Sequence, residues 1–484
     1  MKNFGAIVGG ACVIAIWFGM VAFSSSTARA QSPAPATVQS SAPAPTFNAD
    51  VAPILYRNCV TCHRPGEVAP MSLLSYKVAR PWARAMKTKV LAGDMPPWGA
   101  DPRYGKFRNA PTMTAADVKT LVAWVDGGAP EGAGTPPPAP TFPDGWSAAM
   151  GRPPDFTIEM PVEWEIPASG ELPNFDVFSK VPFTEDKFVE AVELRPSNRA
   201  VTHHSSIRAH PLPLGTKLGK APAWPGGPVP TDDVIPVKVD TGERGVALPD
   251  FSGGGGGDSE QNVLLIWVPG GGFQQFRPGI ARRITPDDYF QWRLHYTATG
   301  KPEKDRHVLG LWFARGPVTH EVISSSTMEV RVVEGKEVLG EGGKRPSVPQ
   351  IPAFADNWTI MGIKAFPDAV TLNSVWPHMH LRGKDMTYTL TYPDGREEII
   401  LSAPKYQFEW QFQYEFVEPL KIPAGTVMRV VSHYDNSARN RTNPGPDKDV
   451  VWGEQSWEEM FNPFYDYSVD KDVLTLTRPI NQSR

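Results

Sequence analysis

The sequence contains little cysteine, and this limits how a chain of 484 residues can be stabilised. Of its three cysteines, Cys12 lies within the first 30 residues, so only Cys59 and Cys62 remain in the mature chain that we expect. Two cysteines cannot form the set of disulfides that many exported proteins carry. We therefore expect these two residues to have a special use, and packing alone to hold the rest of the chain.

The sequence also lacks a strong excess of charge of either sign. The formal net charge is −4, and removal of residues 1–30, which contain Lys2 and Arg29 but no acidic residue, makes it −6. This balance does not favour binding to nucleic acid or to an anionic membrane surface. With 51 prolines, 43 glycines and 21% charged residues, the composition favours a loop-rich β protein, and the length predicts about three domains.

Long apolar runs are absent after the N-terminal segment, where residues 4–23 form a stretch long enough to span a bilayer. This stretch follows Lys2 and ends in Ala28-Arg29-Ala30, which is the pattern of a cleavable secretory signal. We therefore expect residues 1–30 to be a signal peptide and the mature protein to be periplasmic or otherwise exported. An uncleaved membrane anchor is the alternative. Residues 31–46, which carry no charge, predict a flexible tether.

The two remaining cysteines lie in the segment Cys59-Val60-Thr61-Cys62-His63, which has the spacing of a c-type haem attachment site. In such a site the two sulfurs bond the vinyl groups of the haem and the adjacent imidazole binds the iron. A redox-active dithiol is the alternative interpretation. With both thiols used by haem, the sequence has no thiolate left for a blue-copper centre, which argues against laccase-like and copper nitrite reductase classes.

A sixth iron ligand is expected downstream, and Met95 lies 32 residues after His63 in a loop rich in proline. Met71 and Met86 are the competitors, and Met86 lies in a helix-like stretch that favours a core position. Thr114 predicts the start of a helix that ends near Gly127. Residues 47–131 as a whole resemble the cytochrome c family. This resemblance implies a small all-α domain with one covalent haem c and a role in electron transfer.

Residues 132–154 predict a linker rich in Pro and Gly, and the sequence after it favours β-structure. Aromatic residues alternate with polar ones over residues 406–416, which predicts a half-buried strand, and residues 388–401 predict a β-hairpin. We expect two antiparallel, jelly-roll-like β-sandwiches, over residues 155–340 and 341–484. Residues 211–258, with several Pro and Gly clusters, predict a long mobile insertion.

Two pairs of histidines have spacings that suit metal binding. His378 and His380 are two residues apart, which places both imidazoles on one face of a strand. His203 and His204 are adjacent, so they converge only at a strand end or a bulge. By spacing alone, either pair is more often structural than metal-binding. We interpret four other histidines as surface, supporting or structural groups: His210, His307, His320 and His433.

Four short segments together resemble the type II copper monooxygenases, the family of the peptidylglycine α-hydroxylating and dopamine β-monooxygenases. They are Val201-Thr202-His203-His204, Leu294-His295-Tyr296, His378-Met379-His380 and Glu459-Met460-Phe461-Asn462. The resemblance covers about residues 155–470 and implies two copper ions. It implies that an electron-storing copper is bound by His203, His204 and His295. It also implies that a catalytic copper is bound by His378, His380 and Met460, a set whose thioether favours Cu(I).

The resemblance implies an enzyme that hydroxylates a C–H bond of a small organic substrate with O2 at the second copper, while the first copper supplies the second electron. Where peptide-amidating members hold the substrate carboxylate with an arginine and a tyrosine, this sequence has Trp376 and Phe464. We therefore expect an apolar or aromatic substrate. The fused haem predicts that electrons come from a periplasmic donor through the haem. The alternative is a periplasmic haem and copper electron-transfer or copper-binding protein without monooxygenase activity.

Overall fold

The computed structural model describes residues 44–470, apart from residues 143–145, 147–149, 171, 173–174, 212–217, 220–234, 237–262, 270, 327, 339–347 and 454. The expected signal peptide, most of the expected tether and most of the expected insertion at 211–258 lie outside the described residues. In the part of the chain that is described, no helix is long and apolar enough to cross a membrane.

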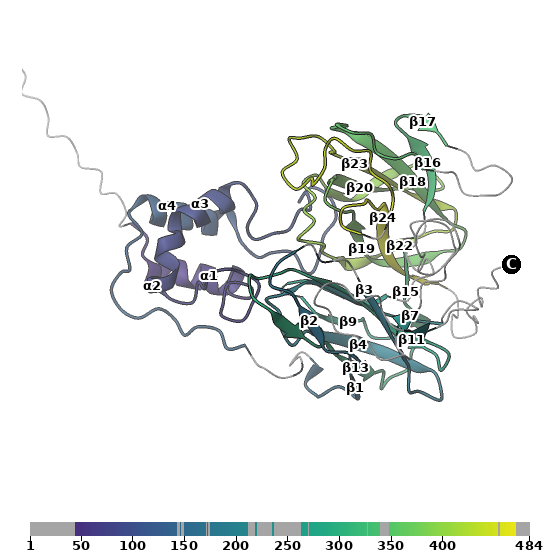
Figure 1. The fold of residues 1–484 in the computed structure, drawn as a ribbon, viewed down its shortest axis with the longest axis horizontal. Coiled ribbons are helices and arrows are strands. Elements are labelled where there is room, and N and C mark those ends of the chain that lie inside the picture. Colours follow the sequence, from purple (N-terminus) through teal and green to yellow (C-terminus); the bar gives the residue numbers. More distant parts are fainter. Residues whose placement is uncertain are drawn as a thin grey trace, which may run out of the picture. The chain divides into compact units, whose positions relative to one another are not determined.

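Strands dominate the described chain, and those before residue 322 form the first β region (Figure 1). One of its sheets has the order β1 (Phe156–Glu159), β13 (Val308–Phe313), β4 (Lys187–Arg195), β10 (Ile280–Ile284) and β14 (His320–Glu321), and β9 (Phe273–Gln275) also pairs with β4. The other has the order β3 (Phe175–Lys180), β11 (Tyr289–Tyr296), β5 (Thr202–His210) and β8 (Val263–Trp267). Two ribbons pair β2 (Trp164–Ile166) with β12 (Glu303–Asp305) and β6 (Leu218–Gly219) with β7 (Ile235–Pro236).

The second β region also has two sheets. One has the order β15 (Ile323–Ser325), β24 (Asn462–Val469), β19 (Val370–His378) and β22 (Tyr414–Ile422). The other has the order β17 (Lys336–Glu337), β16 (Glu329–Val333), β18 (Trp358–Phe366), β23 (Thr426–Tyr434), β20 (Gly383–Thr391) and β21 (Glu397–Ala403). The expected hairpin is confirmed by the antiparallel pair β20 and β21. Strands β15 and β16 pair within this region although they precede residue 340.

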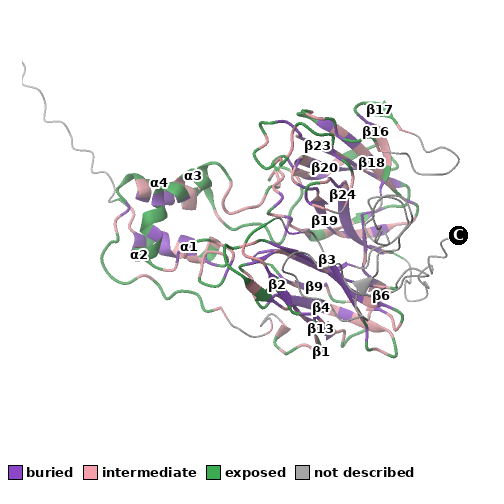
Figure 2. Cartoon of the chain, in the orientation of Figure 1, coloured by how far each residue is buried: buried purple, intermediate pink, exposed green. Residues whose placement is uncertain are grey.

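Each β region has its own hydrophobic core, which the two-residue period of its strands produces. In β23 every second residue is buried, from Thr426 to Tyr434. Figure 2 shows the buried residues concentrated in the strands. In the first region Trp292 and Val192, from different sheets, belong to one buried cluster. Each such side chain contributes roughly 1.5–3 kcal/mol on burial, so the two sheets of a region are held face to face.

The expected all-α cytochrome c domain over residues 47–131 is wrong as a statement of fold, because the molecule is a sheet-rich β protein. The helical turns here are short: η1 Phe47–Val51, α1 Ala52–Asn58, α2 Tyr76–Ala79, η2 Arg80–Trp82, α3 Ala83–Leu91 and α4 Ala115–Asp126. They share a small core that includes Phe47 and Trp124. The loop after α3 instead packs into the second β region, where Phe107 forms a β-bridge with Phe416. The expected helix after Thr114 is confirmed as α4, with a capping box between Thr114 and Asp117.

The expected strand over residues 406–416 is also wrong in its first part, because β22 begins only at Tyr414. Residues 406–413 form a turn and an irregular segment instead. Long-range side-chain hydrogen bonds hold this segment, such as that from the Tyr406 hydroxyl to the carbonyl of Met379 (2.6 Å). Within the segment, the Gln411 side-chain amide donates to the Phe408 carbonyl (3.0 Å), and such local bonds compete with the backbone pairing that a strand requires.

A buried ion pair joins the two β regions. Arg282 on β10 donates to Asp466 on β24 over 2.9 Å, and the side chains are 1% and 2% exposed. The same carboxylate accepts hydrogen bonds from Ser374 (3.1 Å) and Gln413 (2.8 Å), and it contacts the hydroxyl of Ser324. Charged groups this deeply buried are stable only when they are paired and hydrogen-bonded. The network therefore fixes β10 against β24.

We expect Asp466→Ala to lower the free energy of unfolding by about 3–5 kcal/mol, because it leaves the Arg282 guanidinium buried without its partner. The measurement is equilibrium denaturation followed by tryptophan fluorescence. A matched control is Glu398→Ala, which breaks the exposed pair with Arg396 and should cost at most about 1 kcal/mol. Equal losses in the two variants would contradict this role for the buried pair.

Candidate metal centre

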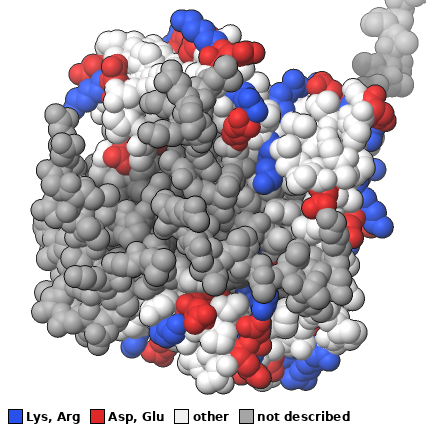
Figure 3. All heavy atoms as spheres, turned by 90° about the vertical axis from the view of Figure 1, so that its right-hand side faces the viewer, with Lys and Arg blue, Asp and Glu red and all other residues white. Residues whose placement is uncertain are grey.

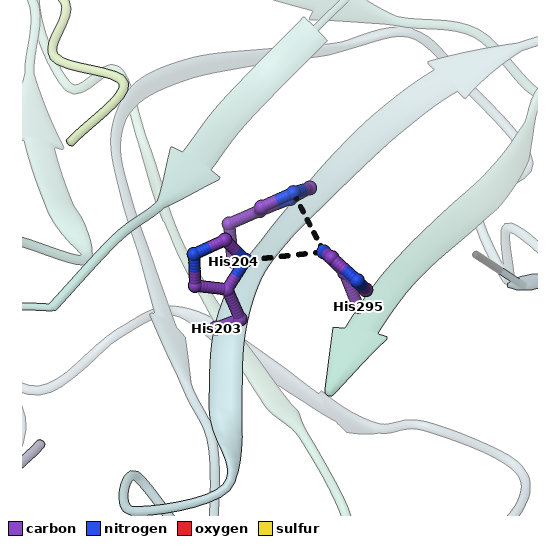
Figure 4. Close-up of side chains that lie close together, drawn as sticks. All are labelled: His203, His204 and His295. Atoms are coloured by element: carbon purple, nitrogen blue, oxygen red, sulfur yellow. Dashed lines mark hydrogen bonds between the residues drawn. The ribbon is translucent and has the colours of Figure 1, made fainter. Parts of the chain in front are cut away.

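Three histidines of the first β region converge, and Figure 4 shows their rings turned toward one another. His203 and His204 are the second and third residues of β5, and His295 lies near the end of the neighbouring β11. Of the two arrangements expected, a strand end or a bulge, the structure has a bulge: His204 pairs with His295, Thr202 pairs with Tyr296, and His203 is the extra residue. This irregularity lets two adjacent imidazoles reach one point.

The ligand nitrogens of this triad lie close together. Nδ1 of His295 lies 3.1 Å from Nδ1 of His203 and 3.0 Å from Nε2 of His204. Three nitrogens bound about 2.0–2.1 Å from one ion are about 2.9–3.5 Å apart, so the spacing suits a metal. The triad can therefore hold a metal ion.

The electrostatics of the triad keep its imidazoles in the form that binds metal. Burial lowers the pKa of His203 to about 4. Burial, and then the charge of His203, lower the pKa of His295 to about 3. Burial and the neighbouring histidines hold the pKa of His204 well below its usual range. All three rings are thus neutral near pH 7, with lone pairs free for an ion.

The second pair of histidines lies at the end of β19. The strand stops at His378, so His380 is not on the same regular strand as expected, yet the two ring centroids are 5.3 Å apart. Nδ1 of His378 donates to Oε1 of Gln411 (2.6 Å), and Nδ1 of His380 donates to the carbonyl of Glu458 (3.2 Å). Both bonds assign the proton to Nδ1 and leave Nε2 as the ligand atom.

Met460 lies on the segment that contacts these two histidines. Its side chain is buried, and its sulfur accepts a hydrogen bond from the Asn462 amide (3.2 Å). Asn462 is the register partner of His378 in the pairing of β19 with β24. The carboxylate of Glu459 accepts backbone hydrogen bonds from His380 (2.9 Å) and Met460 (3.3 Å). Glu459 thus ties the histidine turn to the methionine segment.

Both histidine groups contact one aromatic ring, that of Phe408. The ring centroid of Phe408 lies 5.2 Å from His203, 6.1 Å from His295 and 5.9 Å from His380. Ser456, from the segment before Met460, lies 3.5 Å from Nε2 of His295. The two groups predicted separately are therefore neighbours.

The aromatic residues Trp376 and Phe464 lie beside the second pair. Their rings are stacked, with centroids 5.0 Å apart, and the ring of Phe464 is 6.1 Å from that of His378. They form a small apolar cluster with Val263 of the first β region. Trp376 and Phe464 therefore give His378 an aromatic neighbour, while the side chain of Gln411 and the charges of Arg208 and Arg293 also act on it.

The cysteine segment lies in the helical part of the chain. Cys59 and Cys62 are free thiols, and burial raises the pKa of Cys59 to about 12 and that of Cys62 to about 11. Nδ1 of His63 donates to the carbonyl of Met71 (3.3 Å), so the unprotonated nitrogen of this ring is Nε2. Met95 lies in the loop after α3, and its backbone N–H donates to the carbonyl of Lys89 (3.3 Å).

The other histidines have partners of their own. His307 is fully buried beside Asp305 (2.8 Å) rather than at the surface, and His433 bonds Asp385 (2.6 Å). His210 contacts Gln291 (2.9 Å), and His320 contacts Thr319 (2.9 Å). Met86 is a core residue, as expected.

Sequence reasoning missed Phe408, Gln411 and Ser456. The alternation of aromatic and polar residues over 406–416 predicts a strand with Phe408 on one face and Gln411 on the other. That prediction gave neither residue a role at the site. Glu459 lies in the segment Glu459-Met460-Phe461-Asn462 that the sequence analysis singled out. Only the fold shows that its carboxylate accepts a hydrogen bond from the backbone of His380.

Comparisons with known proteins identify no family. No family model and no curated protein matches the chain. Among solved structures, the chain has a low similarity to an uncharacterized protein from Listeria monocytogenes EGD-e. The sequence identity is 11% and the TM-score is 0.16, and the match covers 37% of this chain and 14% of that one. PNGF-II has 9% identity and a TM-score of 0.19 over 65% of this chain and 59% of its own. Allantoicase has 11% identity and a TM-score of 0.14, and the match covers 56% of this chain and 80% of the allantoicase chain. Similarities this low support no inference about function.

Gln411→Leu should weaken metal binding at His378 and His380 by about 10- to 100-fold, because the ring of His378 loses the acceptor that orients it. Binding at the triad should not change. The measurement is a copper titration against a competing chelator, with Gln407→Leu as a matched control in the same segment. An unchanged copper affinity at His378 and His380 in Gln411→Leu would rule out that Gln411 orients the ring of His378.

Proposed function

We propose that the protein is a copper-dependent monooxygenase that hydroxylates a C–H bond of a small apolar or aromatic substrate. The observation that carries the proposal is the meeting of two histidine groups from different β regions around Phe408. Their ligand sets differ, because a thioether accompanies only the second group. This division suits one ion that stores an electron and one at which O2 reacts.

The reaction is R–H + O2 + two electrons + two protons → R–OH + H2O. Copper supplies these electrons one at a time, so two ions suit the reaction. The electron-storing ion would be held by His203, His204 and His295, and the second ion by His378, His380 and Met460. Gln411 and the Glu458 carbonyl hold the protons of the second pair on Nδ1, which keeps each Nε2 available.

The substrate class is inferred from the aromatic side chains beside His378. Trp376 and Phe464 stack there and present no charge to a carboxylate. An aromatic ring or alkyl chain would gain dispersion and hydrophobic contact against this stack. Neither aromatic ring would hold a peptide carboxylate, and the two arginines whose charges reach His378 are Arg208 and Arg293.

We also propose that a c-type haem attached at Cys59 and Cys62, with His63 and Met95 as axial ligands, delivers the electrons from a periplasmic donor. The hydrogen bond of His63 Nδ1 to the Met71 carbonyl, which leaves Nε2 available to the iron, suits this attachment. Trp98, three residues after Met95, packs against Tyr414 with ring centroids 4.8 Å apart, so the loop leads to the second β region.

Metal analysis tests the copper proposal. We expect one copper at each site, with His203→Ala and His378→Ala each losing one and His320→Ala, as the control, losing neither. Reduced wild-type protein should consume O2 faster when apolar substrates are added, and each ligand variant should lose this increase. Full copper loading without substrate-dependent O2 uptake would instead support an electron carrier or copper-binding protein.

Replacement of Met95 tests the route through the haem. Met95→Ala with full copper should lower the reduction potential of the haem, because thioether ligation raises it, and should abolish turnover with a cytochrome donor. Turnover with a small reductant that reaches copper directly should remain. Met71→Ala is the matched control. A loss of potential in Met71→Ala but not in Met95→Ala would reverse the ligand assignment.

A further inference from the structure

Asp305 is a carboxylate buried inside the first β region, at the end of β12. On the face drawn in Figure 3, acidic side chains lie at the surface beside basic ones, whereas Asp305 is 0% exposed. Its Oδ1 accepts hydrogen bonds from the hydroxyl of Ser197 (3.0 Å) and the backbone N–H of Asn198 (2.8 Å). Its Oδ2 accepts one from the hydroxyl of Tyr296 (2.9 Å) and lies 2.8 Å from Nδ1 of His307. One carboxylate therefore joins two stretches of chain that are far apart in the sequence.

These two stretches carry the ligands of the triad. On β11, Tyr296 directly follows the ligand His295. Before β5, the hydroxyl of Thr202 donates to the carbonyl of Asn198 (3.0 Å), and the two adjacent ligands of the triad follow Thr202. The bonds of Asp305 thus reach the triad from both strands. They go to residues beside the ligands and not to the imidazole rings.

The triad lies where the pairing of β5 with β11 is irregular. The register shifts between His295 and Tyr296, and His203 is the extra residue. A bulge interrupts the ladder of backbone hydrogen bonds, so the ladder alone fixes the ligands less firmly than in a regular pair of strands. A carboxylate that bonds both strands next to the irregularity supplies a further constraint. Hydrogen bonds to a charged acceptor suit this task, because they are roughly twice as strong as neutral ones.

The charge of Asp305 suits its contacts. Burial raises the pKa of this carboxyl, but His307 and the hydrogen bonds that it accepts outweigh burial and hold the pKa below its usual range. The group is therefore an ionised carboxylate near pH 7, and both of its oxygens accept. An amide of the same shape would place an NH2 group, which only donates, against one pair of these donors. Replacement by Asn should thus disturb these contacts with almost no change in volume.

We propose that Asp305 sets the geometry of the triad, by tying β11 beside His295 to the turn that leads into β5. Asp305 is a positioning residue, because it acts on the chain that carries the ligands. The inference rests on the proposed function for the identity of the ion, which is copper. It predicts that the triad, without this tie, binds copper more weakly and in a changed geometry.

Copper affinity in Asp305→Asn tests this role. We expect the affinity of the triad to fall by about 10- to 100-fold, the usual effect of losing a group that orients metal ligands, while the affinity of the second histidine pair stays unchanged. Titration of the full chain against a competing chelator measures both. Asp155→Asn is the matched control, because Asp155 is a carboxylate of the same β region that accepts a backbone hydrogen bond from Phe313 (2.8 Å) instead. It should leave both copper affinities unchanged.

Electron paramagnetic resonance separates a positioning role from a general loss of stability. In the His378→Ala background copper should occupy only the triad, so the Cu(II) spectrum reports that site alone once the haem signal of copper-free protein is subtracted. Asp305→Asn should shift the g values and the copper hyperfine splitting, because the arrangement of the nitrogens changes. A variant that is only less stable would keep the original spectrum in its folded molecules, and that result would overturn the inference.

Tyr296→Phe removes only the tie to β11 and keeps the aromatic ring. It should weaken copper binding at the triad by less than Asp305→Asn does, and the double variant should bind about as weakly as Asp305→Asn alone, since both changes break the same bond. Unchanged affinity and spectrum in Tyr296→Phe would overturn the inference even if Asp305→Asn does not fold.

The inference and the proposed function fail in different ways. Wild-type binding and spectra in these variants would overturn the role of Asp305 and leave the proposed function standing. Altered triad binding in the variants, together with no substrate-dependent O2 uptake by the wild type, would support the role of Asp305 and refute the proposed function. A triad that binds no copper in the wild type would refute both.

Discussion

The buried ion pair between Arg282 and Asp466 is the constraint on which the candidate site depends, because the two histidine groups come from two β regions. Asp466 lies on β24, which pairs with β19, the strand that ends at His378. Arg282 lies on β10 of the first region. Removing either charge would leave the other buried without a partner, at a cost of several kcal/mol. The pair therefore resists sliding of one region against the other, and contacts as short as those around Phe408 need that resistance.

Within each region, burial rather than pairing with acids prepares the histidines. Burial lowers the pKa of His203 to about 4 and that of His378 also to about 4. A carboxylate in the triad would favour protonated imidazoles and would compete with an ion for them. Hydrogen bonds between the rings offset part of the cost of burying these neutral nitrogens, and an ion bound by the triad would offset more, so metal binding there would add to the stability of the fold.

The sequence predicted what local rules determine and missed what depends on distant contacts. The helix after Thr114 and the hairpin of β20 and β21 follow from capping and turn chemistry, and the bulge at His203 follows from the need for two adjacent side chains to converge. The all-α domain was wrong because Phe107 and its neighbours pack against strands more than 300 residues away. The early part of the expected strand at 406–416 was wrong for a similar reason: its alternation reflects contacts with several different parts of the molecule.

That irregular segment connects the features that a regular strand would have kept apart. Phe408 contacts both histidine groups, Gln411 orients His378, and Gln413 donates to Asp466 of the buried ion pair. Tyr414, where β22 begins, packs against Trp98 of the N-terminal loop. A strand would direct these side chains alternately to two opposite faces. The turn at 408 breaks that alternation, so one short stretch supports the metal ligands, the contact between the β regions and the loop that carries Met95. A displacement of this segment would therefore move the histidine groups, the contact between the β regions and the loop that carries Met95.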